Sequence, residues 1–289
     1  MATVGMALRF ESRRVRTVAY SVLVWLLALV WFTPVLWMLA TSLKPGAVAI
    51  SENPPRWVPN PFTLENYLLV ARPAGGISLV RAFVVSAVVA TAATLAVLVT
   101  STPAAYALSL LRFRTQRIVF WTYVASLALP GAVLLVPNYW LVAWMGLLDH
   151  LLALILPGLG GAFGVFLLRQ YMLGIPRELE DAAQIDGCSS LRFLVAVVVP
   201  LIKPALLVLG LISFLGSWNA LLWPLLVINS PDKLTLPLAL VRFRGGWADL
   251  LRGVGPLMSG SFLAVGPVLV LFILFHRYLM RGVSFGVGK

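Results

Sequence analysis

The chain alternates between long apolar segments and short polar ones. Runs without Asp, Glu, Lys or Arg cover residues 17–43, 82–111, 118–148, 151–168, 204–231 and 253–276. Each run approaches or exceeds the roughly 20 residues that a helix needs to cross the hydrocarbon core of a bilayer. We therefore predict an all-α integral membrane protein, a single transmembrane domain over residues 1–289. Its six transmembrane helices are expected at about residues 17–41, 82–110, 118–144, 151–173, 204–229 and 256–280.

The composition agrees with a membrane protein. Only 11% of the residues are charged and the mean hydropathy is +0.97, whereas charged residues make up roughly 25% of a soluble domain. Short segments of strand-type alternation, which would indicate an outer-membrane barrel, are absent. Helices are then the way in which backbone polar groups are satisfied within lipid.

The basic residues predict the orientation, because Lys and Arg are retained on the cytoplasmic side during insertion. With the N-terminus inside, 14 of the 22 basic residues fall on that side and 8 outside. Six spans return the C-terminus to the cytoplasm as well. The net charge of +12 is then explained by topology and contact with anionic lipid, and nucleic acid is not expected as a partner.

Prolines interrupt several of the predicted spans. They stand at residues 103, 130, 137, 157, 224 and 267. Because proline removes a backbone donor and bends a helix, these spans are expected to be kinked, either around a pathway or in ordinary packing. The first apolar run continues without a clear cleavage site, so we interpret it as a retained span and not a signal peptide.

Several kinds of chemistry lack their residues. No charged residue lies near the middle of a predicted span, which disfavours an ion-coupled carrier, and no phosphate-binding G-x-x-x-x-G-K-[ST] loop occurs. His150 and His276 are isolated and Cys188 is the single cysteine, so no metal site is suggested. We find no nucleophile and base that would indicate an enzyme. A passive pore or a transport subunit energised by another chain remains.

The polar segment between the fourth and fifth spans, residues 174–203, distinguishes these two possibilities. It holds four of the chain's ten acidic residues. Pro176 fits the first position of a helix, whose first turns then carry Glu178 and Glu180, where negative charge favours the helix dipole. Gly187 suits the turn out of this helix. A second helix is expected from Ser189 or Ser190 to Val199, with Pro200 at its limit.

The same residues resemble a family motif. The sequence DAAQIDGCSSLRFLVAVVVP resembles the EAA motif of ABC importer permeases, with Asp181 in place of the usual Glu, Gly187 in register, and Val197, Val199 and Pro200 at the end of the motif. Further segments, among them PVLWMLATSLKP, FTLENY and SWNALLWPLLVI, are similar to the carbohydrate-importer branch typified by the second maltose permease. The resemblance covers nearly the whole chain.

The resemblance implies a type I ABC importer permease in the inner membrane of a bacterial or archaeal cell. The loop would be a coupling helix in a groove of an ATPase subunit, and its coupling residues would be Glu180, Asp181, Ala182, Ala183, Asp186 and Gly187. The implied partners are a second, homologous permease, two ATPase subunits and an external substrate-binding protein. ATP and Mg would be bound by the ATPase subunits, and this chain would hold no cofactor. The tail RGVSFGVGK could also touch the ATPases.

A sugar pathway is expected to use aromatic and uncharged polar side chains within the spans. The candidates are Asn138, Tyr139, Trp218, Asn219 and Trp223, each of which could equally serve helix packing, and the substrate contacts could lie mostly on the second permease. Four alternatives stay open at this point: import of another solute such as glycerol phosphate or a polyamine, an uncoupled channel, a membrane enzyme, and a loop that is only structural, with Asp186 and Arg192 in local ion pairs.

Overall fold

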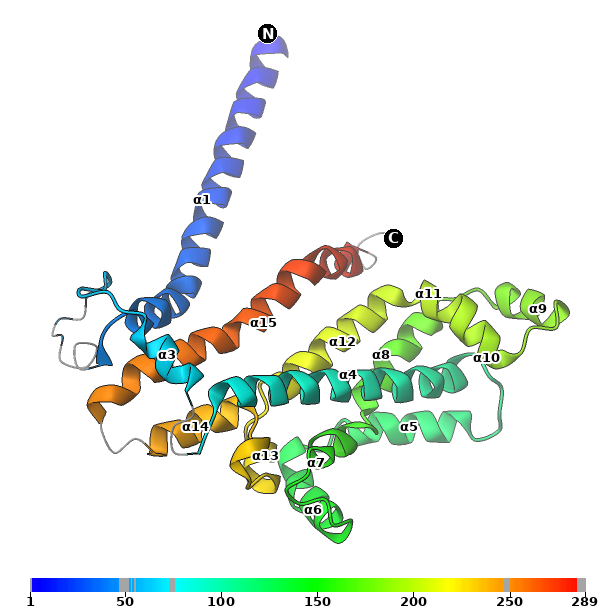
Figure 1. Ribbon diagram of the computed structural model, residues 1–289. Coiled ribbons are helices and arrows are strands. Elements are labelled where there is room, and N and C mark those ends of the chain that lie inside the picture. The colour runs from blue at the N-terminus through cyan, green and yellow to red at the C-terminus, as the bar shows by residue number, and fades with distance from the viewer. Residues whose placement is uncertain are drawn as a thin grey trace. The chain divides into compact units, whose positions relative to one another are not determined.

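The computed structural model describes residues 2–46, 52, 54, 56–72, 76–246 and 250–284. Within these ranges the chain forms helices joined by turns and no strand, which confirms the all-α fold (Figure 1). The helices are α1 (Ala2–Ser42), α3 (Glu65–Ala71), α4 (Leu79–Ser109), α5 (Gln116–Ser126), α6 (Gly131–Trp144), α7 (Leu152–Ile155), η1 (Leu156–Gly158), α8 (Ala162–Met172), α9 (Arg177–Ile185), α10 (Ser190–Phe193), η2 (Leu194–Val198), α11 (Val199–Leu201), α12 (Lys203–Trp218), α13 (Leu222–Val227), η3 (Pro231–Lys233), α14 (Leu236–Gly246) and α15 (Leu250–Ser284).

Three of the described helices are long and apolar enough to cross a membrane by themselves. They are Val18–Ser42 within α1, all of α4, and Val254–His276 within α15. Three pairs of consecutive helices are bent at a short break, and each pair could form one further span. The described residues then contain up to six spans. The pairs are α5 with α6, bent by 104°, α7 and η1 with α8, bent by 46°, and the segment Ser190–Leu201 with α12, bent by 81°.

Two of the predicted proline interruptions coincide with these bends. Pro130 directly precedes α6, and Pro157 lies in the 3-10 turn η1 before α8. In contrast, Pro103 and Pro137 lie within the continuous helices α4 and α6. The predicted fifth span, 204–229, consists of α12, a break at residues 219–221 and the short helix α13, which contains Pro224.

Contacts divide the chain into two compact units, which we describe separately. The first comprises residues 1–70 and 247–263. In it, Asn66 of α3 donates from Nδ2 to the carbonyl oxygens of Ser42 (2.8 Å) and Lys44 (2.7 Å). These acceptors lie at the end of α1, where helix carbonyls lack intrahelical partners. Gly255 of α15 packs against the same Asn66 side chain so closely that a Cβ atom would lie 2.4 Å from Oδ1.

A buried lysine, Lys44, lies just after the end of α1. Lys44 is 1% exposed, and its ammonium group donates to Glu52 at 2.5 Å and to the carbonyl oxygen of Arg56. It also lies 5.4 Å from the ring centre of Trp37. The bond from Lys44 lowers the pKa of Glu52. The lysine charge is therefore paired, as a buried charge must be if it is not to destabilise the fold.

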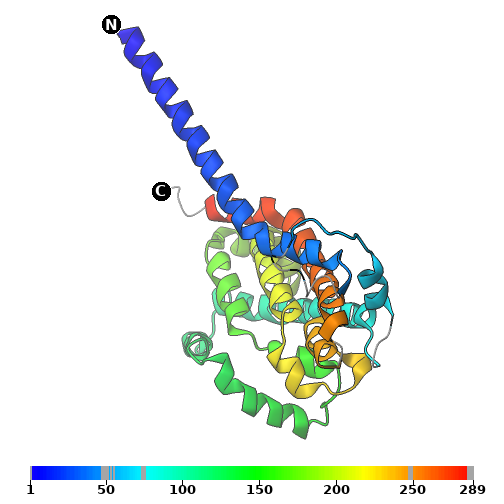
Figure 2. The same cartoon turned by 90° about the vertical axis from the view of Figure 1, so that its left-hand side faces the viewer.

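The second unit comprises residues 71–246 and 264–289, and α4 lies at its centre. Two views show α8 and α12 alongside α4 (Figures 1 and 2). Gly164 permits the close approach of α8, since a Cβ atom there would lie 2.6 Å from Ser101 Oγ on α4 and 3.2 Å from Leu209 on α12. Small residues at such contacts let membrane helices pack closely in the absence of a hydrophobic driving force.

Helix α14 is fixed against the same central helix. The backbone N–H of Leu236 donates to Ser86 Oγ at 2.7 Å, and the neighbouring residues Leu234, Leu238 and Ala239 are buried. The segment after η3 is therefore part of the packed unit and not a free loop.

Candidate functional site

The loop predicted to couple the chain to another subunit begins with α9. Pro176 is the residue before this helix and not its first residue, and Glu178 and Glu180 lie in the first turn. At the other end, Gly187 has φ +68°, and its N–H donates to the carbonyl of Gln184 at 3.0 Å while the N–H of Cys188 donates to that of Ala183 at 2.8 Å. This pair of bonds is the Schellman motif, in which a left-handed glycine ends a helix. The predicted turn at Gly187 is confirmed.

Substitution of Gly187 tests how much the turn matters. Open space surrounds this position, so a side chain meets no obstacle and only the positive φ opposes it. We expect Gly187→Val to cost about 1–2 kcal/mol of local stability, because β-branched residues are disfavoured in the left-handed region, and Gly187→Asn to cost much less. Proteolysis of the loop in the assembled transporter measures the difference. Equal cleavage rates for Val and Asn would contradict this account.

The second helix of the loop begins as expected and ends later. Ser189 Oγ accepts from the N–H of Arg192, which makes it the cap of α10. The helix then widens into a π-helical stretch, η2, and continues through Pro200 to Leu201, beyond the predicted end at Val199. In a π-turn the donors pair one residue further back, so a missing donor and a proline ring are accommodated without ending the helix. The sharp bend follows at Ile202.

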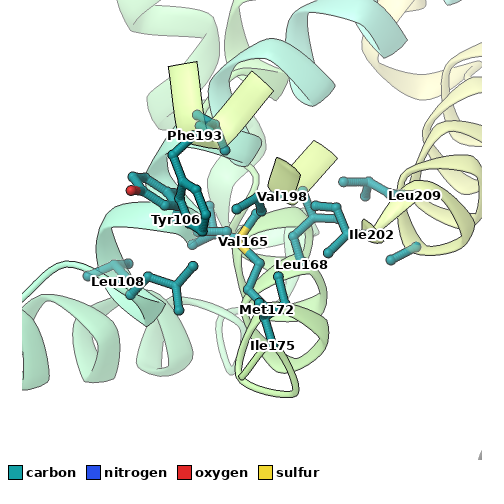
Figure 3. Packing of buried hydrophobic residues seen from close by; sticks show 14 residues of the cluster. Tyr106, Leu108, Val165, Leu168, Met172, Ile175, Phe193, Val198, Ile202 and Leu209 are labelled. Atoms are coloured by element: carbon teal, nitrogen blue, oxygen red, sulfur yellow. The ribbon is translucent and has the colours of Figure 1, made fainter. Parts of the chain in front are cut away.

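A buried apolar cluster ties this second helix to the membrane helices. Figure 3 shows Phe193, Val198 and Ile202 of the loop packed with residues of α4, α8 and α12. Phe193 is 2% exposed and its ring centre lies 6.4 Å from that of Tyr106 on α4. Ala183 and Cys188, at the end of α9, are partly buried against the same cluster. The loop is thus an ordered elbow attached to three membrane helices.

The opposite side of α9 is uncovered. Glu178, Asp181, Ala182 and Ile185 are all exposed, Ile185 to 88%. At 100° per residue these four positions share one side of the helix, which we call the outward face of α9. Glu180 and Ala183, both half-buried, lie on the inner side. Of the predicted coupling residues, Asp181 and Ala182 therefore lie on this face, whereas Ala183 packs on the chain's own core.

Sequence reasoning missed Ile185, and it left the ion-pair question open. The missed signal was the apolar spacing of Ala182 and Ile185 within a helix otherwise rich in charge. Asp186 and Arg192, both exposed, form no salt bridge among the residues that the structure describes. Asp186 is the C-terminal cap of α9, and its backbone N–H donates to the carbonyl oxygen of Ala182.

The five candidate pathway residues lie at the end of α12, on α13 and on α6. Trp218 is 2% exposed, its indole N–H donates to the carbonyl of Ala264 at 3.1 Å, and its ring stacks on Phe214 and meets Phe83 edge-on. Trp223 donates to the carbonyl of Ala153 at 2.8 Å and lines a cavity of about 290 Å³ in the second unit.

The other three candidates are more accessible than Trp218. Asn219 is the residue after α12, and its side chain donates back to the carbonyl of Leu215 at 3.0 Å. Asn138 and Tyr139 lie on α6, where Asn138 is half-buried and Tyr139 is 37% exposed. Neither side chain has a hydrogen bond to another described residue.

A carboxylate clasp joins two loops of the second unit. Asp149, which follows α6 at φ +60°, accepts from the N–H groups of Asn229 and Ser230, both at 2.9 Å, and from the Ser230 hydroxyl. Lys233 donates to its carbonyl oxygen at 2.6 Å. These bonds, the Ser230 hydroxyl foremost, hold the pKa of Asp149 well below its usual range. The clasp fixes the loop before α7 to the loop after α13.

Replacing Asp149 by Asn should weaken this clasp. An amide keeps an oxygen for the N–H groups of Asn229 and Ser230 but removes the charge and puts an N–H group against the Lys233 ammonium. At this half-buried site the change should cost about 1 kcal/mol. Because the folded-state pKa is depressed, the carboxylate stabilises the protein fully above about pH 5 and loses this effect as the pH falls below about 4. Thermal unfolding of the detergent-solubilised protein should show a lower midpoint for Asp149→Asn at pH 7 and a smaller gap to the wild type in acid. Asp232→Asn is the control, and a constant gap would contradict the proposed role of the charge.

No group of three or more His, Cys, Asp or Glu in the described ranges is placed to hold a metal ion. The last five residues of the C-terminal tail lie outside the described part of the chain, so the suggested contact of the tail with an ATPase stays a prediction.

Comparisons with known proteins identify the family. Residues 98–285 match the model of the family described as "Binding-protein-dependent transport system inner membrane component". The chain is 30% identical to the arabinooligosaccharides transport system permease protein AraQ of Bacillus subtilis (strain 168), over 94% of this chain and 95% of that protein. It is 30% identical to the diacetylchitobiose uptake system permease protein DasC of Streptomyces coelicolor, over 89% and 91%.

Two further likenesses bear on substrate and fold. The chain is 34% identical to the sn-glycerol-3-phosphate transport system permease protein UgpE of Brucella abortus (strain 2308), over 72% of this chain and 73% of that protein. The fold matches a crystal structure of a bacterial ABC transporter involved in the import of the acidic polysaccharide alginate, with a TM-score of 0.77 and 23% identity over 92% and 97% of the two chains. The chain therefore belongs to the family of binding-protein-dependent transport system inner membrane components, and it is an ABC importer permease subunit and not an enzyme.

Proposed function

We propose that this chain forms, with a second and homologous permease, the translocation pathway for a sugar that an external binding protein delivers. Two ATPase subunits bind ATP and Mg and drive the cycle. The permease itself carries no cofactor, as is usual in its family. The single observation that supports coupling most directly is the structure of the elbow, residues 174–203. The outward face of α9 is exposed, and the second helix of the loop is buried against α4, α8 and α12.

The physical requirement for such an elbow is stiffness. Closure of the ATPase subunits moves the membrane helices only if the joint between them transmits force without bending. The Schellman turn at Gly187, the cap at Ser189 and the buried Phe193 make the loop an ordered unit. On the outward face, the carboxylate of Asp181 meets basic or donor groups of an ATPase, while Ala182 and Ile185 fill its groove. In this proposal the elbow and both termini lie in the cytoplasm.

The sugar class is supported by the permeases AraQ and DasC, whose names specify oligosaccharides. Tyr139, exposed on α6 without a hydrogen bond to another described residue, is the pathway candidate most free to meet a solute. The likeness to UgpE favours glycerol phosphate as the second candidate. A phosphate requires cationic groups, and the charge-free runs of the predicted spans carry none.

Purification of the assembled transporter with its binding protein tests the proposal. ATPase activity in vesicles should rise when the binding protein carries an oligosaccharide and stay at the basal rate with sn-glycerol 3-phosphate. Stimulation by the phosphate alone would establish the second candidate. Solute flux that persists without nucleotide would instead support an uncoupled channel.

A further inference from the structure

The cavity of about 290 Å³ lies inside the second unit, between α4, α8 and the broken fifth span. Its walls come from Val89 to Val97 on α4, from Leu209 to Ser217 on α12, and from Trp223 and Thr235 beyond the break. Each long wall is nine residues of helix, and eight steps of about 1.5 Å give a length of about 12 Å. The volume equals roughly nine or ten groups the size of a water molecule. The cavity is therefore long and narrow.

Small residues create this space and open it to the surface. Gly158, Gly161 and Gly216 lie in the wall together with Ala93. Gly216 is exposed, and a Cβ atom on it would meet nothing within 4 Å. Phe163, 43% exposed, also lies in the wall. Gly216 lies in α12, which is part of a candidate membrane span, so the molecules beside the opening in the cell are lipids or neighbouring subunits.

The chemistry of the wall favours an apolar occupant. No charged residue lines the cavity, and its polar side chains, apart from the indole N–H of Trp223 that is already bonded, are the hydroxyls of Ser213, Ser217 and Thr235. A sugar needs hydrogen bonds to several hydroxyl groups, which this wall does not supply, and apolar cavities stay free of water.

One wall residue has an unmet hydrogen-bonding requirement. Thr235 is 2% exposed, and its Oγ1 has no hydrogen-bond partner among the described residues. It lies just before Leu236, whose N–H bonds Ser86 near the start of α4, whereas Val97 lies at the other end of the wall. A buried hydroxyl without a described partner at one end of a mostly apolar cavity matches a molecule with an apolar chain and a hydrogen-bond acceptor at its head.

From these observations we propose that the cavity binds one acyl chain of a membrane phospholipid. The chain enters past Gly216 and extends along α4 and α12 towards Val97 and Leu209. The ester oxygens remain near Thr235, whose hydroxyl donates to one of them. The bound lipid fills the space beside the break in the fifth span and so stabilises α12 against α4.

Photolabelling of the complete transporter tests this site. The permeases and ATPase subunits are reconstituted in phosphatidylcholine vesicles that contain a small fraction of phosphatidylcholine with a diazirine in the middle of one acyl chain. After irradiation, mass spectrometry of peptides should find adducts on the wall residues 89–97 and 209–217. Gly216→Leu, which fills the cavity, should lower these adducts about fivefold or more. Gly266→Leu is the matched control, because Gly266 also lies in a helix with open space around it.

Two further variants keep the test decisive. Ala220→Leu fills the same cavity from another position and replaces Gly216→Leu if that protein does not assemble. Thr235→Val preserves the shape and removes the hydroxyl, and it should weaken labelling roughly threefold. Adducts confined to residues outside the wall, or adducts unchanged by filling the cavity, would overturn the proposal. Labelling of the same wall by a diazirine-bearing oligosaccharide would assign the cavity to the sugar pathway instead.

Discussion

Asp181→Lys should lower ATP-driven sugar uptake at least tenfold while the chain still inserts and assembles. Asp181 is exposed on the outward face of α9, and it lies outside the buried cluster that holds the elbow. The substitution therefore leaves the fold of this chain intact. At the contact with an ATPase subunit it replaces attraction by like-charge repulsion, and the loss of one partner of a desolvated charge pair costs about 2–5 kcal/mol.

The measurement is uptake of labelled sugar into vesicles together with the ATPase rate of the same preparation. Uptake should fall and the ATPase rate should lose its response to the loaded binding protein. Asp232→Lys is the matched control. Asp232 is an exposed carboxylate in a surface salt bridge with Arg81, and such pairs contribute about 0–1 kcal/mol. Normal coupled uptake by Asp181→Lys would show that this carboxylate does not meet the ATPase.

The parts of the elbow that depend on neighbouring residues could be predicted from the sequence. Gly187 ends α9 because a glycine adopts positive φ without strain. Ser189 caps α10 because its hydroxyl accepts a hydrogen bond from a backbone N–H in the first turn of the helix. Both are local effects within a few residues. The six apolar runs predicted helices for the same reason, since hydropathy over about 20 residues is also local information.

The parts that depend on distant contacts could not be predicted. Proline at position 200 indicated a helix end, yet the π-helical stretch before it carries the helix on to Leu201. Ala183 was expected to face a partner and instead packs on the core, because it joins a buried cluster formed by α4, α8, α12 and the second helix of the loop. Trp218 has a polar indole that suits a pathway, but the rings of Phe83 and Phe214 enclose it. Phe214 is only one helical turn from Trp218, but Phe83 comes from α4, far away in the sequence.

The third and fifth spans show the same limit at a larger scale. A continuous apolar run over 118–144 predicted one crossing, and the structure has two helices at 104° around Pro130. Hydropathy reports that a segment is apolar without reporting its direction. Where a helix bends, some backbone N–H and C=O groups lose their hydrogen-bond partners within the helix. Within a membrane such groups are tolerated only where they are buried in protein or line a cavity. The break in the fifth span, next to the cavity lined by Trp223, follows this rule.

Gly255→Ala should destabilise the first unit by about 2–5 kcal/mol, since two buried acceptors would lose their donor. A Cβ atom at residue 255 would lie 2.4 Å from Oδ1 and 2.7 Å from Nδ2 of Asn66. Asn66 is 3% exposed, so its amide cannot move aside without breaking its bonds to the carbonyl groups of Ser42 and Lys44. The thermal midpoint of the purified protein should fall, and protease should cut the segment after α1 more rapidly.

The double variant separates a clash from a general defect of α15. Asn66→Ala alone removes the two hydrogen bonds, and adding Gly255→Ala to it should cost little more, because the obstructing amide is gone. Gly266→Ala, in the same helix with open space around it, should leave the midpoint within about 0.5 kcal/mol of the wild type. If Gly255→Ala is equally harmless, the close approach of α15 to Asn66 does not hold the end of the first span. If the two costs instead add in full, Gly255 acts on the helix by itself and not through Asn66.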